Sequence, residues 1–234
     1  MSTTTRPARP RPRTAAVGSI LLALGTIQFF VAHLVAQAAW TNPAYSWWNN
    51  YISDLGATVC GPFSDNYVCS PLHPIMNTAF VLQGMLMLTG ITLIARSRIL
   101  SLRRATWPIM IAVTGISWIL VGLIPEDVNL TGHSIGALPI FILGNTALVT
   151  AGISDSTRTL PAIRGTALAL GVLGLVGFGL TVVAVTNPTG PIGIGIAERI
   201  TVFPAQVWAF TLGIGVLSRL YAGRRRSSRH RRSR

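Results

Sequence analysis

Four side chains of this sequence could perform acid–base chemistry, namely Asp54, Glu126, His133 and Glu198. All four lie close to the ends of long apolar stretches, outside their centres. Carboxyl and imidazole groups are the usual proton donors and acceptors in catalysis, and partial burial raises the pKa of a carboxyl group. We therefore expect these four residues to be catalytic if the protein is an enzyme.

Three further polar residues could bind a substrate: Ser53, Asn77 and Arg199. Arg199 is unusual because the other arginines all lie in four basic segments elsewhere in the chain. A charge inside a bilayer costs about 2.5 to 3.5 kcal/mol on insertion scales, so Arg199 must be paired or must bind an anion. Its planar guanidinium suits a lipid phosphate, and an ion pair with a nearby carboxylate such as Glu198 is the alternative.

Three histidines, His33, His73 and His133, are expected on the same side of the membrane as these carboxylates. Histidines and carboxylates are the ligands of hydrolytic zinc sites. The spacing gives no support, because the sequence contains no H-E-x-x-H and each histidine belongs to a different apolar stretch. Zinc is therefore a minor alternative, no residue is assigned as a metal ligand, and the cofactor stays open.

Cys60 and Cys69 are separated by eight residues, a spacing that is no zinc signature but is long enough to close a disulfide. A disulfide requires an oxidising compartment. We expect a Cys60–Cys69 disulfide in a segment outside the cytoplasm, and two reduced thiols are the alternative.

The composition is typical of a polytopic membrane protein, since 50% of the 234 residues are hydrophobic and only 11% are charged. A helix needs about 20 apolar residues to cross roughly 30 Å of hydrocarbon. Six stretches reach this length, so we predict an all-α bundle of six transmembrane helices. They are Ala15–Ala38, Pro74–Ala95, Ala105–Leu123, Ser134–Ile153, Thr166–Val185 and Ile200–Leu220.

Arginine placement predicts the orientation of this bundle. Apart from Arg199, the arginines lie in Arg6–Arg13, Arg96–Arg104, Arg158–Arg164 and Arg219–Arg234. Basic segments stay on the cytoplasmic side. We therefore expect both termini in the cytoplasm of a multi-pass protein of the cell membrane. The connections after the first, third and fifth stretches, which carry the candidate site, then lie outside.

Two basic tails, residues 1–14 and 221–234, flank a membrane domain of residues 15–220. Their composition cannot bury a core, so we expect disorder in both. The net charge of +13 indicates contact with anionic lipid and not nucleic acid, because the arginines flank the apolar stretches. A cleaved secretory signal is the alternative for the first stretch, since Ala36-Gln37-Ala38 resembles a cleavage site.

The longest connection, residues 39–73, carries Trp47 and Trp48, and such rings favour the membrane interface. We expect a short interfacial helix over residues 45–55, ended by Gly56. In the fifth stretch four glycines leave one ridge without side chains, so another helix can approach it closely. These glycines are Gly171, Gly174, Gly177 and Gly179.

Three motifs together resemble a known family. They are Asn50-Tyr51-Ile52-Ser53-Asp54-Leu55-Gly56, then Gly122-Leu123-Ile124-Pro125-Glu126-Asp127 with His133-Ser134-Ile135-Gly136-Ala137, and Gly195-Ile196-Ala197-Glu198-Arg199 with Pro204 and Trp208. Over residues 15–220 the chain resembles the bacterial integral membrane proteins grouped as domain of unknown function 998. The resemblance implies six spans, and it implies no established activity. It places six of the residues named above on polar motif positions: Ser53, Asp54, Glu126, His133, Glu198 and Arg199.

These observations together favour an outer-leaflet polar pocket that binds an anionic lipid or an isoprenoid-like molecule and, in an enzyme, modifies it as a hydrolase or transferase. Arg199 would hold the head group, and His133 would position or relay protons. A proton-coupled small-molecule transporter and a non-catalytic assembly protein are the alternatives. Polar residues are sparse along the cytoplasmic halves of the stretches, which argues against transport. The sequence indicates no oligomeric state.

Overall fold

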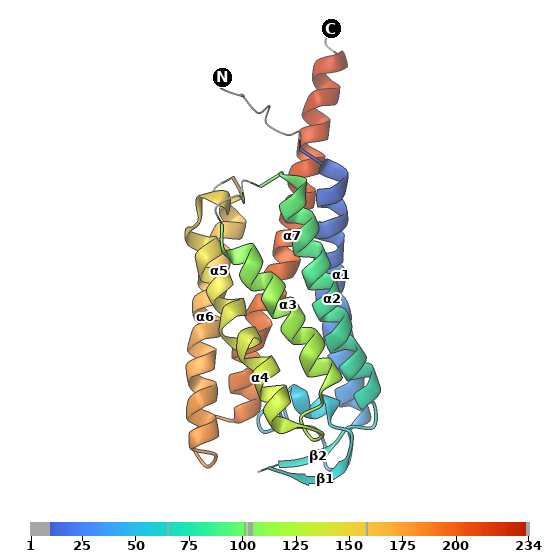
Figure 1. Cartoon of the computed structure of the whole chain (residues 1–234), viewed down its shortest axis with the longest axis vertical. Coiled ribbons are helices and arrows are strands. Elements are labelled where there is room, and N and C mark those ends of the chain that lie inside the picture. The colour runs from blue at the N-terminus through green and yellow to red at the C-terminus, as the bar shows by residue number, and fades with distance from the viewer. Residues whose placement is uncertain (1–9, 65, 101, 103–104, 158, 233–234) are drawn as a thin grey trace, which may run out of the picture.

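The structure is a computed structural model that describes residues 10–64, 66–100, 102, 105–157 and 159–232. Within these ranges, α-helices form one elongated bundle (Figure 1). The helices are α1 (Pro12–Ala39), α2 (His73–Ser97), α3 (Trp107–Leu123), α4 (Leu130–Phe141), α5 (Leu143–Ile153), α6 (Pro161–Thr186) and α7 (Ile194–Arg232). Smaller elements are the 3₁₀ helices η1 (Ser53–Gly56) and η2 (Asp155–Thr157) and an antiparallel hairpin of β1 (Cys60–Phe63) and β2 (Asn66–Cys69). The predicted all-α bundle is confirmed.

Proline marks the beginning of four helices. α1, α2, α3 and α6 carry Pro12, Pro74, Pro108 and Pro161 in their first turns. A proline at this position lacks an N–H that the helix would not use, and its φ angle is already helical. The apolar stretches therefore begin as helices at defined residues.

Five helical segments are long and apolar enough to cross a membrane: Pro12–Ala39, His73–Ser97, Leu130–Ile153, Pro161–Thr186 and Ile194–Gly223. The third predicted span corresponds to α3, which is apolar but has only 17 residues and a length of about 25 Å. Pro125 follows closely and disfavours helix at Ile124 before it, so α3 cannot continue. The chain has the architecture of a multi-pass membrane protein.

The fourth predicted span consists of two helices, α4 and α5. They are separated at Ile142, and Pro139 lies within α4. An internal proline removes one helical hydrogen bond and its ring collides with the carbonyl four residues earlier, which bends or interrupts the helix. This interruption lets α4 diverge from the course of α5 at the end of the bundle that carries the candidate site.

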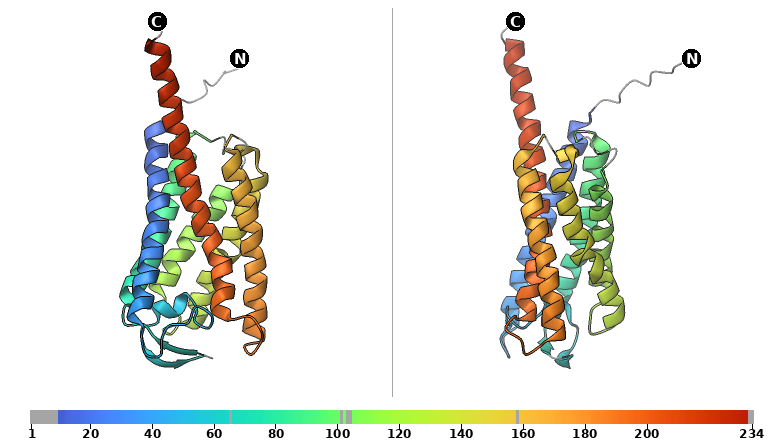
Figure 2. Two further views of the ribbon diagram at one scale, coloured as in Figure 1. Left: turned by 180° about the vertical axis from the view of Figure 1, so that it is seen from behind. Right: turned by 90° about the vertical axis from the view of Figure 1, so that its left-hand side faces the viewer.

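The two ends of the bundle carry different segments of the chain. One end holds the start of α1, the C-terminal part of α7, and the α2–α3 and α5–α6 connections (Figures 1 and 2). The four arginine-rich segments of the sequence fall in these parts of the chain. The opposite end holds η1, the hairpin, and the α3–α4 and α6–α7 connections. We call this second end the pocket end. The predicted site residues all belong to elements that meet there.

Two local predictions about the first connection and the C-terminal tail are wrong. Of the expected interfacial helix, only residues 53–55 are helical, and they belong to the 3₁₀ helix Ser53–Gly56. The reason is that the N–H groups of Tyr51 and Ile52 donate to side-chain carboxylates instead of to helical carbonyls. At the other end of the chain, α7 continues through Arg232, so helix extends past residue 220. Most of the predicted N-terminal tail, residues 1–9, lies outside the described residues.

The sequence predicts close packing at four glycines of α6, and the structure shows it at three of them. A Cβ atom added at Gly177 would lie 2.5 Å from the backbone N of Thr201 in α7, and one at Gly171 would lie 2.7 Å from the N of Val149 in α5. Gly174 packs directly against Asn145. Gly179 has open space around it, so the expectation of packing at that position is wrong.

Gly177→Ala will therefore destabilise the bundle, whereas Gly179→Ala will not. The added methyl group at 177 meets backbone atoms of α7, which cannot move aside without separating the helices. Overpacking of this kind costs about 1 to 3 kcal/mol. Thermal unfolding of both variants in the same detergent measures the difference, and equal midpoints for the two variants would show that α6 does not pack on α7 through Gly177.

Candidate functional site

A cavity of about 760 Å³ lies at the pocket end, between α4, α6 and the first connection. Five of the predicted site residues line its polar end: Ser53, Asp54, Glu126, His133 and Glu198. Its walls are largely apolar and include Leu130, Leu138, Phe141, Phe178, Val182, Val185 and Ile192. Sites for small molecules in proteins have similar volumes and the same combination of apolar walls with a few polar groups. We call this cavity the pocket.

The pocket is open along the side of the bundle. Leu138 of α4 and Val182 and Val185 of α6 line it, yet they remain 47%, 47% and 55% exposed. The gap exists because α6 packs on α5 and α7 and barely contacts α4. Toward the middle of the bundle, the rings of Phe141 and Phe178 approach to 6.3 Å between centroids and close the gap.

Asp54 and Glu126 form a carboxyl pair at the polar end of the pocket. Asp54 comes from η1 and Glu126 follows α3, and they are only 1% and 5% exposed. The two carboxyl groups lie close enough to influence each other's pKa, and Ser53 lies near Glu126. Neighbouring carboxyl groups in a buried site do not both ionise readily, because like charges repel and burial disfavours the charged form. We therefore expect the pair to hold one shared proton.

The surroundings of the pair place this proton on Glu126. Oδ2 of Asp54 accepts hydrogen bonds from Nδ2 of Asn50 at 2.9 Å and from the N–H of Tyr51 at 3.0 Å, which favour its charged form. Within the described part of the chain, Oε1 of Glu126 is buried without a partner. Burial, and then the adjacent charge of Asp54, raise the pKa of Glu126 well above its usual value. Burial also raises the pKa of Asp54, against the effect of its hydrogen bonds.

Glu198 completes the acidic end of the pocket from the second turn of α7. It is 5% exposed, and Oε2 accepts a hydrogen bond from the N–H of Ile52. This contact joins α7 to the first connection across 146 positions of sequence. Three carboxyl groups from three separate elements therefore converge on one side of the pocket.

Arg199 lies outside the pocket lining, although it follows Glu198 directly. Its Nη1 donates to the carbonyls of Gly195 at 2.7 Å, Asn50 at 3.0 Å and Trp47 at 3.3 Å, and its Nη2 donates to the Tyr45 hydroxyl. The guanidinium carbon also lies 4.8 Å from the ring centroid of Trp47. Among the described residues, none of these hydrogen bonds goes to a carboxylate. Arg199 thus fixes the backbone of the first connection.

His133 joins α4 to the end of α3. Its Nδ1 lies 2.7 Å from the carbonyl oxygen of Ile124, and since a carbonyl can only accept, this nitrogen carries a proton. Asn129, the residue that precedes α4, accepts from the N–H of Gly132 at 2.9 Å and caps the helix. The cap and the histidine together set the beginning of α4, so the imidazole lies on the pocket wall.

Asn77 also lies outside the pocket lining and supports η1. From α2, its Nδ2 donates to the carbonyl of Gly56 at 2.8 Å. Gly56 lies so close to this side chain that an added Cβ would collide with it. Asn77 therefore positions the segment that carries Asp54.

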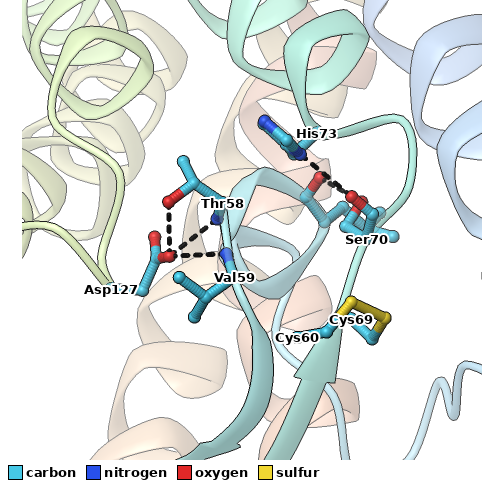
Figure 3. Close-up of a disulfide and its surroundings, with 8 residues drawn as sticks. Thr58, Val59, Cys60, Cys69, Ser70, His73 and Asp127 are labelled. Carbon is cyan, nitrogen blue, oxygen red and sulfur yellow. Dashed lines mark hydrogen bonds between the residues drawn. A yellow bond between two sulfur atoms is a disulfide. The ribbon is translucent and has the colours of Figure 1, made fainter.

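The predicted disulfide between Cys60 and Cys69 is confirmed, and it closes the hairpin (Figure 3). Oδ2 of Asp127 accepts from the N–H and hydroxyl of Thr58, at 2.7 and 2.8 Å, and from the N–H of Val59 at 3.0 Å. Figure 3 shows these contacts just before the first strand. The hairpin contributes Phe63 and the following Ser64 to the pocket lining. Asp127 and the disulfide thus hold the hairpin over the pocket.

The three histidines considered for zinc are not brought together. His33 is packed among aromatic rings, His73 contacts the carbonyl of Ser70, and His133 binds the end of α3. Throughout the described part of the chain, no three His, Cys, Asp or Glu side chains are arranged to hold a metal ion. The zinc interpretation has no geometric support.

Several residues of the site are not identified by sequence reasoning. Asn50 contacts Asp54 at a spacing of four residues, which is a signal that could have been used. Tyr45 and the carbonyl of Trp47 bind Arg199 across about 150 positions, and no local pattern predicts such a contact. Phe63 reaches the pocket only because the hairpin folds over it.

Comparison with known proteins gives one family. Residues 16–215 match the family described as "Protein of unknown function (DUF998)". Neither the curated proteins nor the solved structures gave a match to the chain. The family match covers far more than half of the 234 residues and includes every residue of the candidate site. The chain therefore belongs to the DUF998 family of proteins of unknown function.

Proposed function

We propose that this protein binds an amphipathic, lipid-like or isoprenoid-like molecule in the pocket, with the apolar part between α4 and α6. The supporting observation is that polar side chains lie at one end of the pocket and apolar side chains line the rest. Three carboxyl groups and His133 lie at one end, and leucine, valine and phenylalanine side chains line the rest. The opening along the side of the bundle gives such a molecule a direct path from the hydrocarbon layer.

The carboxyl pair supplies the groups needed for proton transfer to a bound molecule. Glu126 is the proton donor, because its neutral form is favoured by burial and by the charge of Asp54. Asp54 is the acceptor, because two hydrogen bonds support its ionised form. A neighbouring acid and base with separated pKa values are the requirement of general acid–base catalysis, so a transferase or hydrolase activity on the bound molecule is within reach of this site.

Binding from the membrane is favoured over proton-coupled transport by the residues in the middle of the bundle. The buried polar side chains there include Thr26, Gln83 and Gln206, which hydrogen-bond within the α1–α2–α7 core, with 2.6 Å between Nε2 of Gln83 and Oε1 of Gln206. Hydroxyl and amide groups do not take up and release protons near neutral pH. These three side chains therefore offer no titratable group to a proton pathway through this part of the core.

The pocket end is placed on the outer face of the cell membrane in this proposal. The Cys60–Cys69 disulfide at the pocket end supports an oxidising compartment. The arginines at the opposite end support the cytoplasmic side, where they would contact anionic lipid.

Thiol labelling tests this orientation. Thr189→Cys, in the exposed α6–α7 connection, will react with a membrane-impermeant maleimide on intact cells when Cys60 and Cys69 are replaced by serine. Asp155→Cys, exposed at the opposite end, will react only after permeabilisation. Labelling of Asp155→Cys on intact cells, or of both variants alike, would reverse or abolish the proposed orientation.

Blocking the pocket tests the binding function. Ala137→Trp places an indole inside the pocket, whereas Val176→Trp adds the same ring on a surface of α6 that is 54% exposed and outside the pocket lining. Native mass spectrometry of the proteins purified in mild detergent will show at least about tenfold less co-purified amphiphile for Ala137→Trp than for Val176→Trp. Equal amounts in both variants would rule out the pocket as the binding site.

The shared proton predicts a pH-dependent stability. The native pair retains a proton that unfolded carboxyl groups release above their ordinary pKa, 4.5 for Glu126, so the free energy of unfolding falls as pH rises from there. Asp54, Ser53 and Glu198 are the groups that face Glu126. Glu126→Gln replaces the protonated carboxyl by a neutral amide and will flatten this decline.

Thermal unfolding between about pH 5 and pH 8 provides the measurement. Asp155→Asn removes an exposed carboxyl group at the opposite end and serves as the control. This variant will keep the wild-type slope of stability against pH. A Glu126→Gln protein with an unchanged slope would mean that the pair holds no proton in the native state.

A further inference from the structure

We propose that the amphiphile in this pocket carries a primary ammonium head group, which contacts Asp54, Glu126 and Glu198. This inference rests on the proposed function and names the chemical class of its ligand. It differs from the anionic head group that Arg199 indicates in the sequence, because the structure separates that arginine from the pocket lining.

Three carboxyl groups and His133 line the pocket, with no arginine or lysine among its described lining residues to match the carboxyl groups. Among the described residues that form its wall, Asp54, Glu126 and Glu198 are acidic and no arginine is present, and the whole chain contains no lysine. The nearest cation, Arg199, is already committed to three carbonyls and the Tyr45 hydroxyl. An anionic head group would therefore meet the ionised Asp54 in a buried site, where charge interactions are poorly screened.

The polar end of the pocket also has an unused hydrogen-bond acceptor, so a ligand that donates hydrogen bonds fits it best. Oε1 of Glu126 is an acceptor, the residue is 5% exposed, and no partner from the described residues reaches this oxygen. A buried acceptor without a partner costs free energy that a ligand donor can recover. An ammonium group has three donors and no acceptor, so it can contact carboxyl groups from several elements at once. A phosphate or carboxylate would bring further acceptors to a site that already has them in excess.

The geometry of the pocket suits a single cation with an attached apolar chain. Glu198 enters from α7, Asp54 from η1 and Glu126 from the end of α3, so the carboxyl groups approach the polar end from different sides. Leu138 and Val182 then line the route from this end to the open side of the bundle. An alkylamine can place its nitrogen among the carboxyl groups while its chain follows the apolar walls.

Three probes with the same chain test this inference: hexadecylamine, hexadecanol and hexadecyl phosphate, titrated into the full-length protein in a neutral detergent. Trp48 lines the pocket and is 51% exposed, so the part of the tryptophan fluorescence change that is lost in Trp48→Phe reports on binding. The amine will bind at least about tenfold more tightly than the phosphate, a preference of about 1.4 kcal/mol. The Asp54→Asn/Glu126→Gln double variant will lose this preference, and Asp155→Asn will keep it.

Each outcome decides a different claim. If the amine, alcohol and phosphate bind with equal affinity, or the phosphate binds best, the head-group inference is wrong and the amphiphile pocket remains. If none of the probes competes with a bound amphiphile, or if all bind Ala137→Trp as they bind the wild type, the proposed function itself fails. If the double variant does not fold, Glu198→Gln alone provides the second test, with a reduced preference for the amine as the expected result.

Discussion

The architecture of the pocket end depends on the contact between α7 and the first connection. Two neighbouring residues of α7 act in opposite directions: Arg199 donates to carbonyls of the connection, and Glu198 accepts the N–H of Ile52. Both side chains are almost fully buried. A buried charge is tolerated only when hydrogen bonds replace its water, so the connection must adopt one backbone course to satisfy them. That course brings Asp54 to Glu126 and forms the polar end of the pocket.

Sequence reasoning identified most of the fold because the signals are local or statistical. Apolar length, first-turn prolines and the clustering of arginine each depend on a short stretch of chain, and they predicted the helices and the two unlike ends. The shortening of α3 and the interruption between α4 and α5 follow from Pro125 and Pro139. The hairpin and the lack of an interfacial helix depend on contacts from other elements, which no local pattern contains.

The residues of the candidate site could be predicted from the sequence better than their arrangement. Ser53, Asp54, Glu126, His133 and Glu198 lie together on the pocket lining, as the outer-end clustering of polar residues indicated. Arg199 and Asn77 lie outside it and hold backbone carbonyls instead. From sequence, an isolated arginine at a membrane interface looks like an anion site. Only the fold reveals that its Nη1 and Nη2 groups hold the carbonyls of Trp47 and Asn50 and the Tyr45 hydroxyl, and so shape the loop.

The pocket is proposed to bind an amphiphile that enters from the membrane. The apolar walls, the open side between α4 and α6 and the acidic polar end each agree with this function. A structure from crystals grown in a lipidic mesophase tests most directly whether an amphiphile occupies the pocket. The account predicts continuous elongated density between Leu138 and Val182 that ends against Asp54 and Glu126. A pocket closed by its own side chains, or filled by water alone along that route, would contradict it.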